Sequence, residues 1–191
     1  MKVLVGCECS GTVRDAFLNR GHDAVSCDLK PSKKPGPHYQ CDVREIINEC
    51  WDLAVFHPDC THLAVSGARW FYKKQTEQKE ALDFVRLLMS VDIPKIAIEN
   101  PVSIISTHIR KPDQIVQPWM FGDPHTKTTC LWLKNLPTLE PTNVVSKGNR
   151  HITKSGKSLP EWYNFPPSDD RAEIRSKTFE GFARAMAEQW G

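Results

Sequence analysis

Three short runs of aliphatic residues, separated by stretches long enough for a helix, constrain the fold of this chain most strongly. They are "KVLVG" at residues 2–6, "DLAVFH" at residues 52–57 and "KIAIEN" at residues 95–100. Each run is nearly all apolar, so each strand is expected to be buried on both faces. Strands of this kind that alternate with helices form a parallel sheet covered on both sides. The sequence therefore predicts an α/β fold with a Rossmann-like, doubly wound, mostly parallel sheet and helices on both faces.

The segments between these runs have the periodicity of helices. "TVRDAFLNRG" at residues 12–21 ends at Gly21, and "EQKEALDFVRLLMSVD" at residues 77–92 repeats apolar residues at i, i+3, i+4 and i+7. The other expected elements are a strand at 22–29, a brief helix at 41–51, one or two strands around 128–133, and a closing helix at 171–190 that faces the core with Phe179, Phe182, Ala183 and Met186. The polar "SKGNRHITKSGKS" at residues 146–158 is expected to be a mobile loop.

Length and composition indicate one globular domain, residues 1–191, with 40% hydrophobic and 25% charged residues. Residues 1–100 are interpreted as the cofactor and catalytic half, and residues 101–191 as the substrate-side and closing segment. No run approaches the roughly 18 apolar residues of a membrane helix, and the first residues are too briefly apolar for a secretory signal. A cytoplasmic protein is therefore expected. Seven cysteines without C-x-x-C spacing argue against a disulfide framework or zinc ribbon, so most are expected to be reduced and buried.

Polar residues follow the first strands, where ligands bind in open α/β sheets. The turn "GCECSG" at residues 6–11 places Cys9, Ser10 and Gly11 before a helix, either as a cofactor loop or as an ordinary turn. Asp28 ends the second strand, where it either accepts hydrogen bonds from a ribose or caps a loop. Asp42 either ends a third strand or caps the helix after it. Together these features favour a cofactor that contains adenosine.

The order of these motifs resembles that of the cytosine-5 DNA methyltransferases over roughly the first hundred residues. The matching elements are "ECSG", Asp28, "CDV", "HPDCTHLAVSG" at residues 57–67 and "IENP" at residues 98–101. The resemblance implies a methyltransferase-like fold and S-adenosylmethionine as the methyl donor, bound by Ser10, Gly11, Asp28 and Asp42, with Cys9 and Pro58 beside it. The short chain is also similar to small bacteriophage members that lack a recognition insert, which implies a location in the host cytoplasm.

The chemistry of such a reaction requires a cysteine. Carbon 5 of a pyrimidine is a poor nucleophile until a thiolate adds at carbon 6 and produces an enamine-like intermediate. Cys60, in a turn after a strand, matches this role as a covalent catalyst, and local positive charge or helix-end amides would have to raise its thiolate fraction. Glu99, at the end of the next apolar strand, is placed to hydrogen-bond or protonate the ring nitrogen.

Other interpretations of Cys60 stay open. A cysteine at the end of a buried strand is often only a small hydrophobic residue. His57, Cys60 and His62 are metal-ligating residue types, but side chains on one extended segment do not easily converge on a tetrahedral ion, so no metal is assigned. Asp59, directly before Cys60, is expected to raise the pKa of the thiol and to oppose nucleophilic chemistry.

The predicted substrate contacts are mostly polar or cationic. "RWFYKK" at residues 69–74 mixes aromatic and cationic side chains, which suits stacking on bases and contacts with phosphates, or else forms a partly buried aromatic patch. The net charge of +2 does not by itself predict a polyanion partner. Residues 146–158 are either a loop that closes over a polyanion or a solvated linker. The residues assigned to substrate binding are Ser66, Arg69, Trp70, Asn100 and Lys127.

Three functions are compatible with these features. The first is methyl transfer to carbon 5 of cytosine in DNA, with Cys60 as nucleophile, Glu99 as ring partner and an extruded base. The second is a methyltransferase-like fold without turnover that binds a nucleotide or a partner. The third is an enzyme that modifies free pyrimidine nucleotides. With so few residues after position 100, a homodimer or a partner subunit is expected to supply any sequence specificity.

Overall fold

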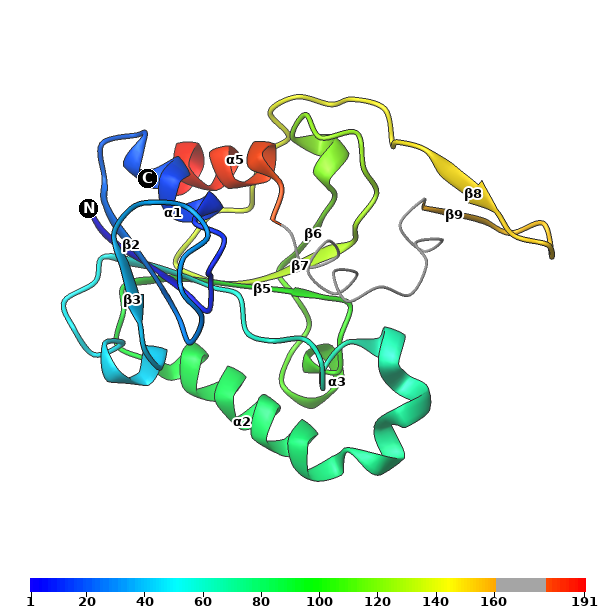
Figure 1. Ribbon diagram of the computed structural model, residues 1–191, viewed down its shortest axis with the longest axis horizontal. Coiled ribbons are helices and arrows are strands. Elements are labelled where there is room, and N and C mark those ends of the chain that lie inside the picture. The colour runs from blue at the N-terminus through cyan, green and yellow to red at the C-terminus, as the bar shows by residue number, and fades with distance from the viewer. Residues whose placement is uncertain (161–177) are drawn as a thin grey trace.

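The computed structural model describes residues 1–160 and 178–191, and its centre is a sheet of seven strands in the order β3-β2-β1-β4-β5-β7-β6 (Figure 1). The seven strands are β1 (Lys2–Gly6), β2 (Asp23–Asp28), β3 (His38–Gln40), β4 (Leu53–Phe56), β5 (Lys95–Pro101), β6 (Gln114–Val116) and β7 (Thr129–Lys134). The pairs among β1 to β5 are parallel, whereas β7 is antiparallel to both of its neighbours. The predicted mostly parallel, doubly wound sheet is confirmed.

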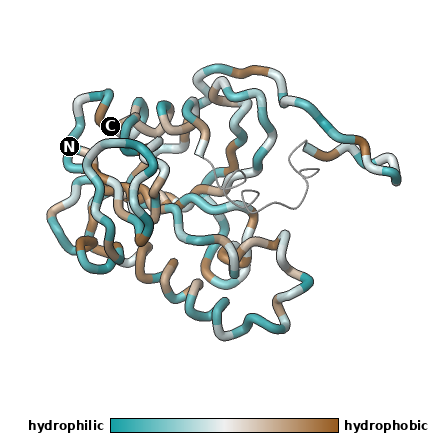
Figure 2. Tube along the Cα trace, in the orientation of Figure 1, coloured by the Kyte–Doolittle hydropathy of each residue, from teal (hydrophilic) through white to brown (hydrophobic). Residues whose placement is uncertain are grey.

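Helices cover both faces of the sheet (Figure 1). The helical elements are α1 (Thr12–Leu18), α2 (Gln75–Ser90), α3 (Ile105–His108), α5 (Glu180–Trp190) and the 3-10 turns η1 (Val43–Glu45), η2 (Val65–Lys73) and η3 (Pro118–Met120). Residues of α1 and α5 belong to the core on one face, and residues of η1, α2 and α3 to the core on the other. In Figure 2 the hydrophobic colour gathers along the central strands between these two layers.

The alternation of side chains along each strand explains why both faces are apolar. Val3 and Val5 of β1 contribute to the core under α1 and α5, whereas Leu4 between them contributes to the core under α2. The same division holds in β4, where Val55 and Phe56 point to opposite cores. Because both sets of side chains are buried, the strands need continuous apolar runs, as the sequence predicted.

A close contact between β1 and β4 makes a glycine necessary at the end of β1. Gly6 is paired in register with Phe56, and a Cβ atom added at Gly6 would lie 2.5 Å from Cδ1 of the Phe56 ring. Real Cβ atoms do not approach another carbon so closely. Gly6 therefore serves strand packing rather than the approach of a ligand.

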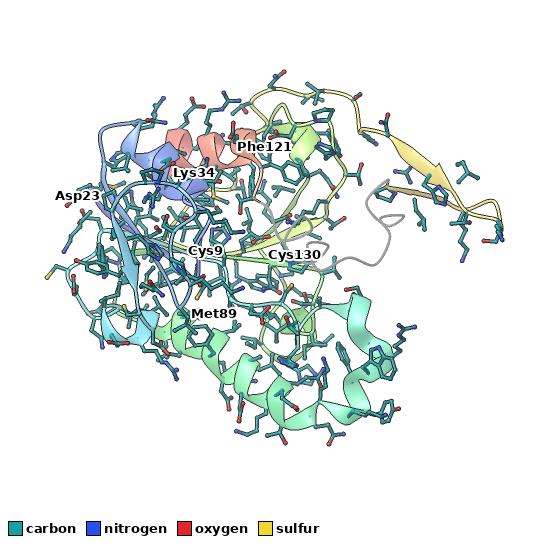
Figure 3. The ribbon with its side chains drawn as sticks, viewed as in Figure 1. Cys9, Asp23, Lys34, Met89, Phe121 and Cys130 are labelled. Atoms are coloured by element: carbon teal, nitrogen blue, oxygen red, sulfur yellow. The ribbon has the colours of Figure 1, made fainter. Side chains whose placement is uncertain are left out.

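A fully buried arginine organises the loop between β2 and β3. The Arg14 guanidinium donates to the carbonyl oxygens of Pro35 (2.9 Å) and Lys34 (3.3 Å) and to the Ser32 hydroxyl (3.0 Å), and it pairs with Asp15 at 2.8 Å. These bonds tie the loop that carries Lys34, marked in Figure 3, to α1. They satisfy polar groups that would otherwise be costly to bury.

Several expectations differ from the structure. Residues 146–158 were predicted to be a mobile loop, but they contain most of a hairpin of β8 (Arg150–Ile152) and β9 (Ser158–Pro160), while the short edge strand β6 was not predicted. The predicted closing helix is observed from Glu180, with Phe182, Ala183 and Met186 buried and Phe179 partly buried, and residues 171–177 lie outside the described residues. All seven cysteines are free, but only Cys27 and Cys130 are buried.

Replacement of the buried guanidinium should destabilise the fold strongly. We expect Arg14→Met to lower the free energy of unfolding by about 3 kcal/mol, because carbonyl groups of the β2–β3 loop lose their donors. Urea denaturation followed by circular dichroism measures this change. Arg20→Met is the matched control: Arg20 is exposed, and its 3.4 Å ion pair with Glu188 contributes less than about 1 kcal/mol. Equal losses in the two variants would contradict the role given to Arg14.

Candidate active site

The loop after β4 holds Cys60 in a tight turn. The backbone carbonyl of Cys60 accepts hydrogen bonds from the amides of Leu63 (3.0 Å) and Ala64 (2.9 Å). Leu63 is fully buried and fastens the turn to the core below α2. Asp59 is exposed, and its carboxylate accepts from the amide and the hydroxyl of Thr61. The backbone of Cys60 is therefore fixed in the loop that follows the carboxyl end of β4.

The loop after β5 braces this turn. The amide of Val65 donates to the carbonyl of Val102 (3.1 Å), and the amide of Ile104 donates to the carbonyl of Leu63 (3.0 Å). Nδ2 of Asn100 donates to the carbonyl of Pro58 at 2.9 Å. Asn100, predicted to bind substrate, is only 1% exposed. Its side chain fixes the loop that carries Cys60 instead of lying open to a ligand.

A histidine and a glutamate join the ends of β4 and β5. The parallel register pairs Phe56 with Ile98, so the residues that follow, His57 and Glu99, come together. Nδ1 of His57 lies 3.1 Å from Oε2 of Glu99. A carboxylate only accepts hydrogen bonds, so Nδ1 carries the proton and donates it. Sequence reasoning considered His57 only as a metal ligand; within residues 1–160 and 178–191 no cluster of three or more suitable side chains forms a metal site.

The pKa values of Glu99 and Cys60 are shifted in opposite directions. Burial alone would raise the pKa of Glu99, but the hydrogen bond from His57 and the positive charges of His57 and Lys127 lower this pKa overall. Burial raises the pKa of the Cys60 thiol, and the nearby carboxylates Asp59 and Glu99 raise it further, although Lys127 counteracts them in part. Glu99 is thus ionised at neutral pH, and the resting thiol is protonated.

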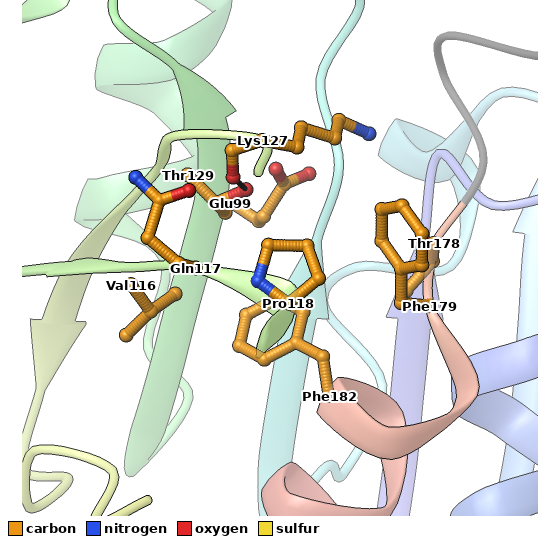
Figure 4. Close-up of a pocket in the computed structure, with 9 residues that line it drawn as sticks. All are labelled: Glu99, Val116, Gln117, Pro118, Lys127, Thr129, Thr178, Phe179 and Phe182. Atoms are coloured by element: carbon orange, nitrogen blue, oxygen red, sulfur yellow. Dashed lines mark hydrogen bonds between the residues drawn. The ribbon is translucent and has the colours of Figure 1, made fainter. Parts of the chain in front are cut away.

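A pocket opens beside Glu99 (Figure 4). Its lining comes from β5, from the segments around β6 and β7, and from the start of α5; the residues are Glu99, Val116, Gln117, Pro118, Lys127, Thr129, Thr178, Phe179 and Phe182. Nε2 of Gln117 donates a hydrogen bond to the Thr128 hydroxyl at 2.9 Å. Oε1 of the same side chain therefore points away from Thr128. Glu99 and the predicted substrate residue Lys127 line this pocket together, but Cys60 does not.

The turn after β1 centres on a buried acid that sequence reasoning missed. Oε1 of Glu8 accepts hydrogen bonds from the Ser10 hydroxyl (2.5 Å) and from the amide of Val13 in α1 (3.1 Å). Glu8 is 4% exposed, and its Oε2 is buried without a hydrogen-bond partner in the described residues. Its signal in the sequence is an acidic residue just ahead of a helix N-terminus, where a carboxylate is favourable.

Gly11, Asp28 and Asp42 were also predicted to bind the cofactor at this turn, and each has a structural role. Gly11 has a φ of 73°, and a Cβ atom there would lie 2.5 Å from the Arg14 guanidinium, so both conformation and space require glycine. Asp28 accepts from the backbone amide of Lys30 at 2.9 Å, as a loop cap does. Asp42 caps η1 and pairs with Arg44, whose hydrogen bonds lower the pKa of the Asp42 carboxyl.

Carboxylates from three strand ends meet around Cys7, the residue before Glu8. Burial raises the pKa of the Cys7 thiol to about 12, and Asp28, Asp42 and Asp59 contribute to the increase. The pKa of the neighbouring Cys9, labelled in Figure 3, is also raised, first by burial and then by Asp28. Negative charge from these carboxylates thus acts on Cys7, whereas Lys33 and Lys30 partly offset the effect of Asp28 at Cys9.

The predicted base-binding segment is exposed. Ser66, Arg69 and Trp70 lie in η2, with the Arg69 guanidinium 5.1 Å from the centre of the Trp70 ring. Trp70 is 46% and Tyr72 67% exposed, whereas Phe71 between them is partly buried, so both the base-binding interpretation and the aromatic patch stay open. None of these side chains lines the pocket beside Glu99.

In the part of the chain that the structure describes, none of the helices has the length and apolar character needed to span a membrane.

Comparisons with known proteins extend the description of the fold. No family model and no curated protein matches the sequence. Among solved structures, the chain is similar to the crystal structure of a candidate DNA modification methyltransferase encoded within an E. coli prophage, with 15% identity and a TM-score of 0.51. The match covers 78% of this chain and 53% of the other, so this chain spans about half the length of that protein. The shared feature is the fold, a mostly parallel sheet with helices on both faces.

Loss of the His57 donor should change the titration of Glu99. We expect His57→Ala to raise the pKa of Glu99, because burial then acts without its main opposing interaction, so that the ionised form is lost at a higher pH than in the unmodified protein. Carbon-13 NMR of labelled glutamate, assigned with Glu99→Gln, measures this. His62→Ala, in the same loop, should leave the titration unchanged. An identical Glu99 titration in His57→Ala would show that the hydrogen bond has no electrostatic role.

Proposed function

We propose that this chain transfers a methyl group from S-adenosylmethionine to carbon 5 of cytosine in DNA. The observation that carries the proposal is the placement of Cys60 and Glu99 near the carboxyl ends of the adjacent parallel strands β4 and β5, with His57, which directly follows β4, hydrogen-bonded to Glu99. Glu99 lies close enough to Cys60 to influence its ionisation, since Glu99 contributes to the raised pKa of the Cys60 thiol. The methyltransferase-like fold is consistent with this activity.

Cys60 would supply the covalent step. Its thiolate adds to carbon 6 of the ring, so that a sulfur–carbon bond forms and the electron pair of the 5,6 double bond makes carbon 5 nucleophilic. S-adenosylmethionine, when bound, supplies an electrophilic methyl group. After transfer, the proton on carbon 5 passes to water, its electron pair re-forms the 5,6 double bond, and the sulfur–carbon bond breaks to release the thiolate of Cys60. Lys127 is the cation that lowers the thiol pKa in the described structure, so it would favour formation of the thiolate.

Glu99 would select cytosine through its ionised carboxylate. The lowered pKa makes Glu99 a hydrogen-bond acceptor, not the proton donor that the sequence alone also allowed. The amino group at carbon 4 of cytosine is a donor and fits such an acceptor, whereas the carbonyl oxygen at the same position of uracil or thymine would be repelled. His57 holds one carboxylate oxygen and leaves the other for the base.

The turn after β1 and the acids around it fit a cationic methyl donor. The unpartnered Oε2 of Glu8 is a buried acceptor at this turn, and Asp28 and Asp42 add negative charge nearby. A ligand with a sulfonium, an ammonium and ribose hydroxyl groups is suited to such an environment. We propose that S-adenosylmethionine, the methyl donor, is bound by Glu8, Cys9, Ser10, Gly11, Asp28, Asp42 and Pro58. Because the Asp42 carboxylate is occupied by Arg44, Asp28 is the acid best placed to bind a ribose.

DNA is the proposed substrate, and the target base would be extruded from the duplex to reach Cys60. Ser66, Arg69, Trp70 and Lys127 are proposed to contact it, with Asn100 acting through the loop that it braces. A homodimer or a partner subunit would supply sequence specificity.

A second candidate is a methyltransferase-like protein that binds a nucleotide without turnover. The observation that favours it is the raised pKa of Cys60, because a protonated thiol is a poor nucleophile. The trapping experiment below separates the two functions. Addition of dCMP as an alternative substrate tests whether a free nucleotide is modified instead.

Trapping with 5-fluorocytosine tests the covalent step directly. Fluorine at carbon 5 cannot leave as a proton does, so methyl transfer should stop at the Cys60 adduct. We expect duplex DNA containing this base, together with S-adenosylmethionine, to give a protein–DNA adduct seen by denaturing electrophoresis and mass spectrometry. Cys60→Ser should give none and should keep cofactor binding, whereas Cys50→Ser, at an exposed thiol, should behave as the unmodified protein. An adduct formed by Cys60→Ser would refute the assignment.

Binding of the methyl donor tests the acid at the end of β2. We expect Asp28→Asn to weaken S-adenosylmethionine binding about 10-fold, the equivalent of one charged hydrogen bond of roughly 1.4 kcal/mol. Isothermal titration calorimetry gives the dissociation constant. Asp23→Asn is the control, since Asp23 lies at the opposite end of the same strand and is exposed (Figure 3). Equal affinity in Asp28→Asn would exclude Asp28 from the site.

A further inference from the structure

A basic hairpin outside the main sheet is the feature that the proposed activity leaves unexplained. β8 and β9 pair only with each other, with Arg150 opposite Pro160 and Ile152 opposite Ser158. The turn between them is closed by the amide of Thr153, which donates to the carbonyl of Lys157 at 2.9 Å. In Figure 1 the hairpin extends away from the body of the molecule. An isolated two-stranded hairpin is only marginally stable in water. A hairpin that projects from the domain is therefore a candidate for a functional role.

The base of the hairpin is attached to the wall of the pocket beside Glu99. The Thr126 hydroxyl donates to the carbonyl of Lys147 at 2.8 Å, and the amide of Val145 donates to the carbonyl of Trp119 at 2.9 Å. Nζ of Lys147 lies 5.2 Å from the centre of the Trp119 ring. Trp119 belongs to η3, directly after the pocket residues Gln117 and Pro118. The hairpin is thus connected to the candidate site through a short, ordered segment.

The charge of this segment is of one sign. Residues 141–160 include Lys147, Arg150, Lys154 and Lys157 and contain no aspartate or glutamate, although the whole chain nearly balances 25 basic against 23 acidic residues. Lys154 and Lys157, at the tip, are exposed and form no ion pair in the described structure. The Arg150 guanidinium is held across the ribbon by Ser158, at 2.6 Å from its hydroxyl and 2.7 Å from its carbonyl. Unpaired, exposed cations on an ordered ribbon favour a polyanionic partner.

The hairpin also lies on the appropriate side of the sheet. The carboxyl ends of the parallel strands, where Cys60 and Glu99 lie, point toward the side from which the hairpin extends, and η2 with Arg69, Trp70 and Lys73 lies on that side as well (Figure 1). A two-stranded β-ribbon fits the major groove of B-DNA, which is about 12 Å wide, and lysines along it reach the phosphates on either side.

We propose that the β8–β9 hairpin is a docking arm for duplex DNA, which contacts the phosphate backbone through Lys154 and Lys157 beside the base held at Cys60 and Glu99. The inference rests on the proposed function for the nature of the substrate. It assigns the DNA contact to a segment that no resemblance or comparison identified.

Salt-dependent binding of a 20-base-pair duplex, measured by fluorescence anisotropy on the full chain, tests the arm. Lys154→Gln combined with Lys157→Gln should weaken binding roughly 10-fold or more at low salt, equally for unrelated sequences, and should reduce the slope of log affinity against log salt by about 2. The control combines Lys2→Gln and Lys95→Gln, which remove the same charge at the amino ends of β1 and β5. It should bind as the unmodified protein does.

The outcomes separate the arm from the proposed reaction. An unchanged affinity and salt slope in the hairpin variant would overturn the arm, as would an equal loss in the control. Displacement of the duplex by polyglutamate, or tighter binding of double-stranded RNA, would assign the hairpin to another partner and also overturn it. Hairpin-dependent DNA binding without any 5-fluorocytosine adduct would leave the arm standing and remove the methyl-transfer function.

Discussion

The parallel pairing of β4 with β5 is the constraint on which the candidate site depends. It sets Phe56 beside Ile98, and with them the two residues that follow, His57 just beyond β4 and Glu99 within β5. Because side chains alternate between the faces of a strand, a shift of one residue would direct Glu99 to the opposite face and break this contact. The hydrogen bonds between the loops after β4 and β5 extend the same register to Cys60. The site is therefore a property of the sheet and not of one loop.

The site places charges where water cannot freely screen them, and their balance decides its chemistry. Glu99 remains ionised because His57 and Lys127 outweigh the effect of burial, whereas Cys60 remains protonated because two carboxylates and burial outweigh Lys127. The carboxylate of Glu99, kept ionised by His57 and Lys127, is thus prepared as an acceptor for the base and at the same time restrains the nucleophile. A restrained thiol is less exposed to oxidation and alkylation, since the thiolate is the reactive form. Arrival of a substrate would have to change this balance before the covalent step.

The sequence was sufficient for the parts of the fold that depend on local pattern. The apolar runs at 2–6, 52–57 and 95–100 and the periodicity at 77–92 all appear as predicted, because strands buried on both faces and amphipathic helices have direct sequence signatures. The adjacency of the chain after β4 to Glu99 was also predictable, since parallel strands end at one edge of a sheet. The hairpin at 150–160 was not, because its polar residues have the composition of a loop and its ladder depends on cross-strand partners.

Other features escaped prediction because their partners are distant in sequence or depend on exact geometry. Arg14 finds its acceptors about 20 residues away in a loop without secondary structure, and nothing local distinguishes it from an exposed helical arginine. The bracing role of Asn100 depends on how the turn at Pro58 folds back. Glu8 carried a helix-start signal, but its burial came only from the packing of the strands around it. These residues are buried by contacts with parts of the chain that are distant in sequence, so the local sequence pattern could not identify them.

The contact between Gly6 and Phe56 limits which sequences can adopt this fold. The ring of Phe56 fills the volume that any side chain at position 6 would need, so neither position is free to vary alone. A larger residue at the end of β1 would require a smaller one at the end of β4, exchanged in the same lineage. The packing thus ties together two positions that are 50 residues apart in the sequence.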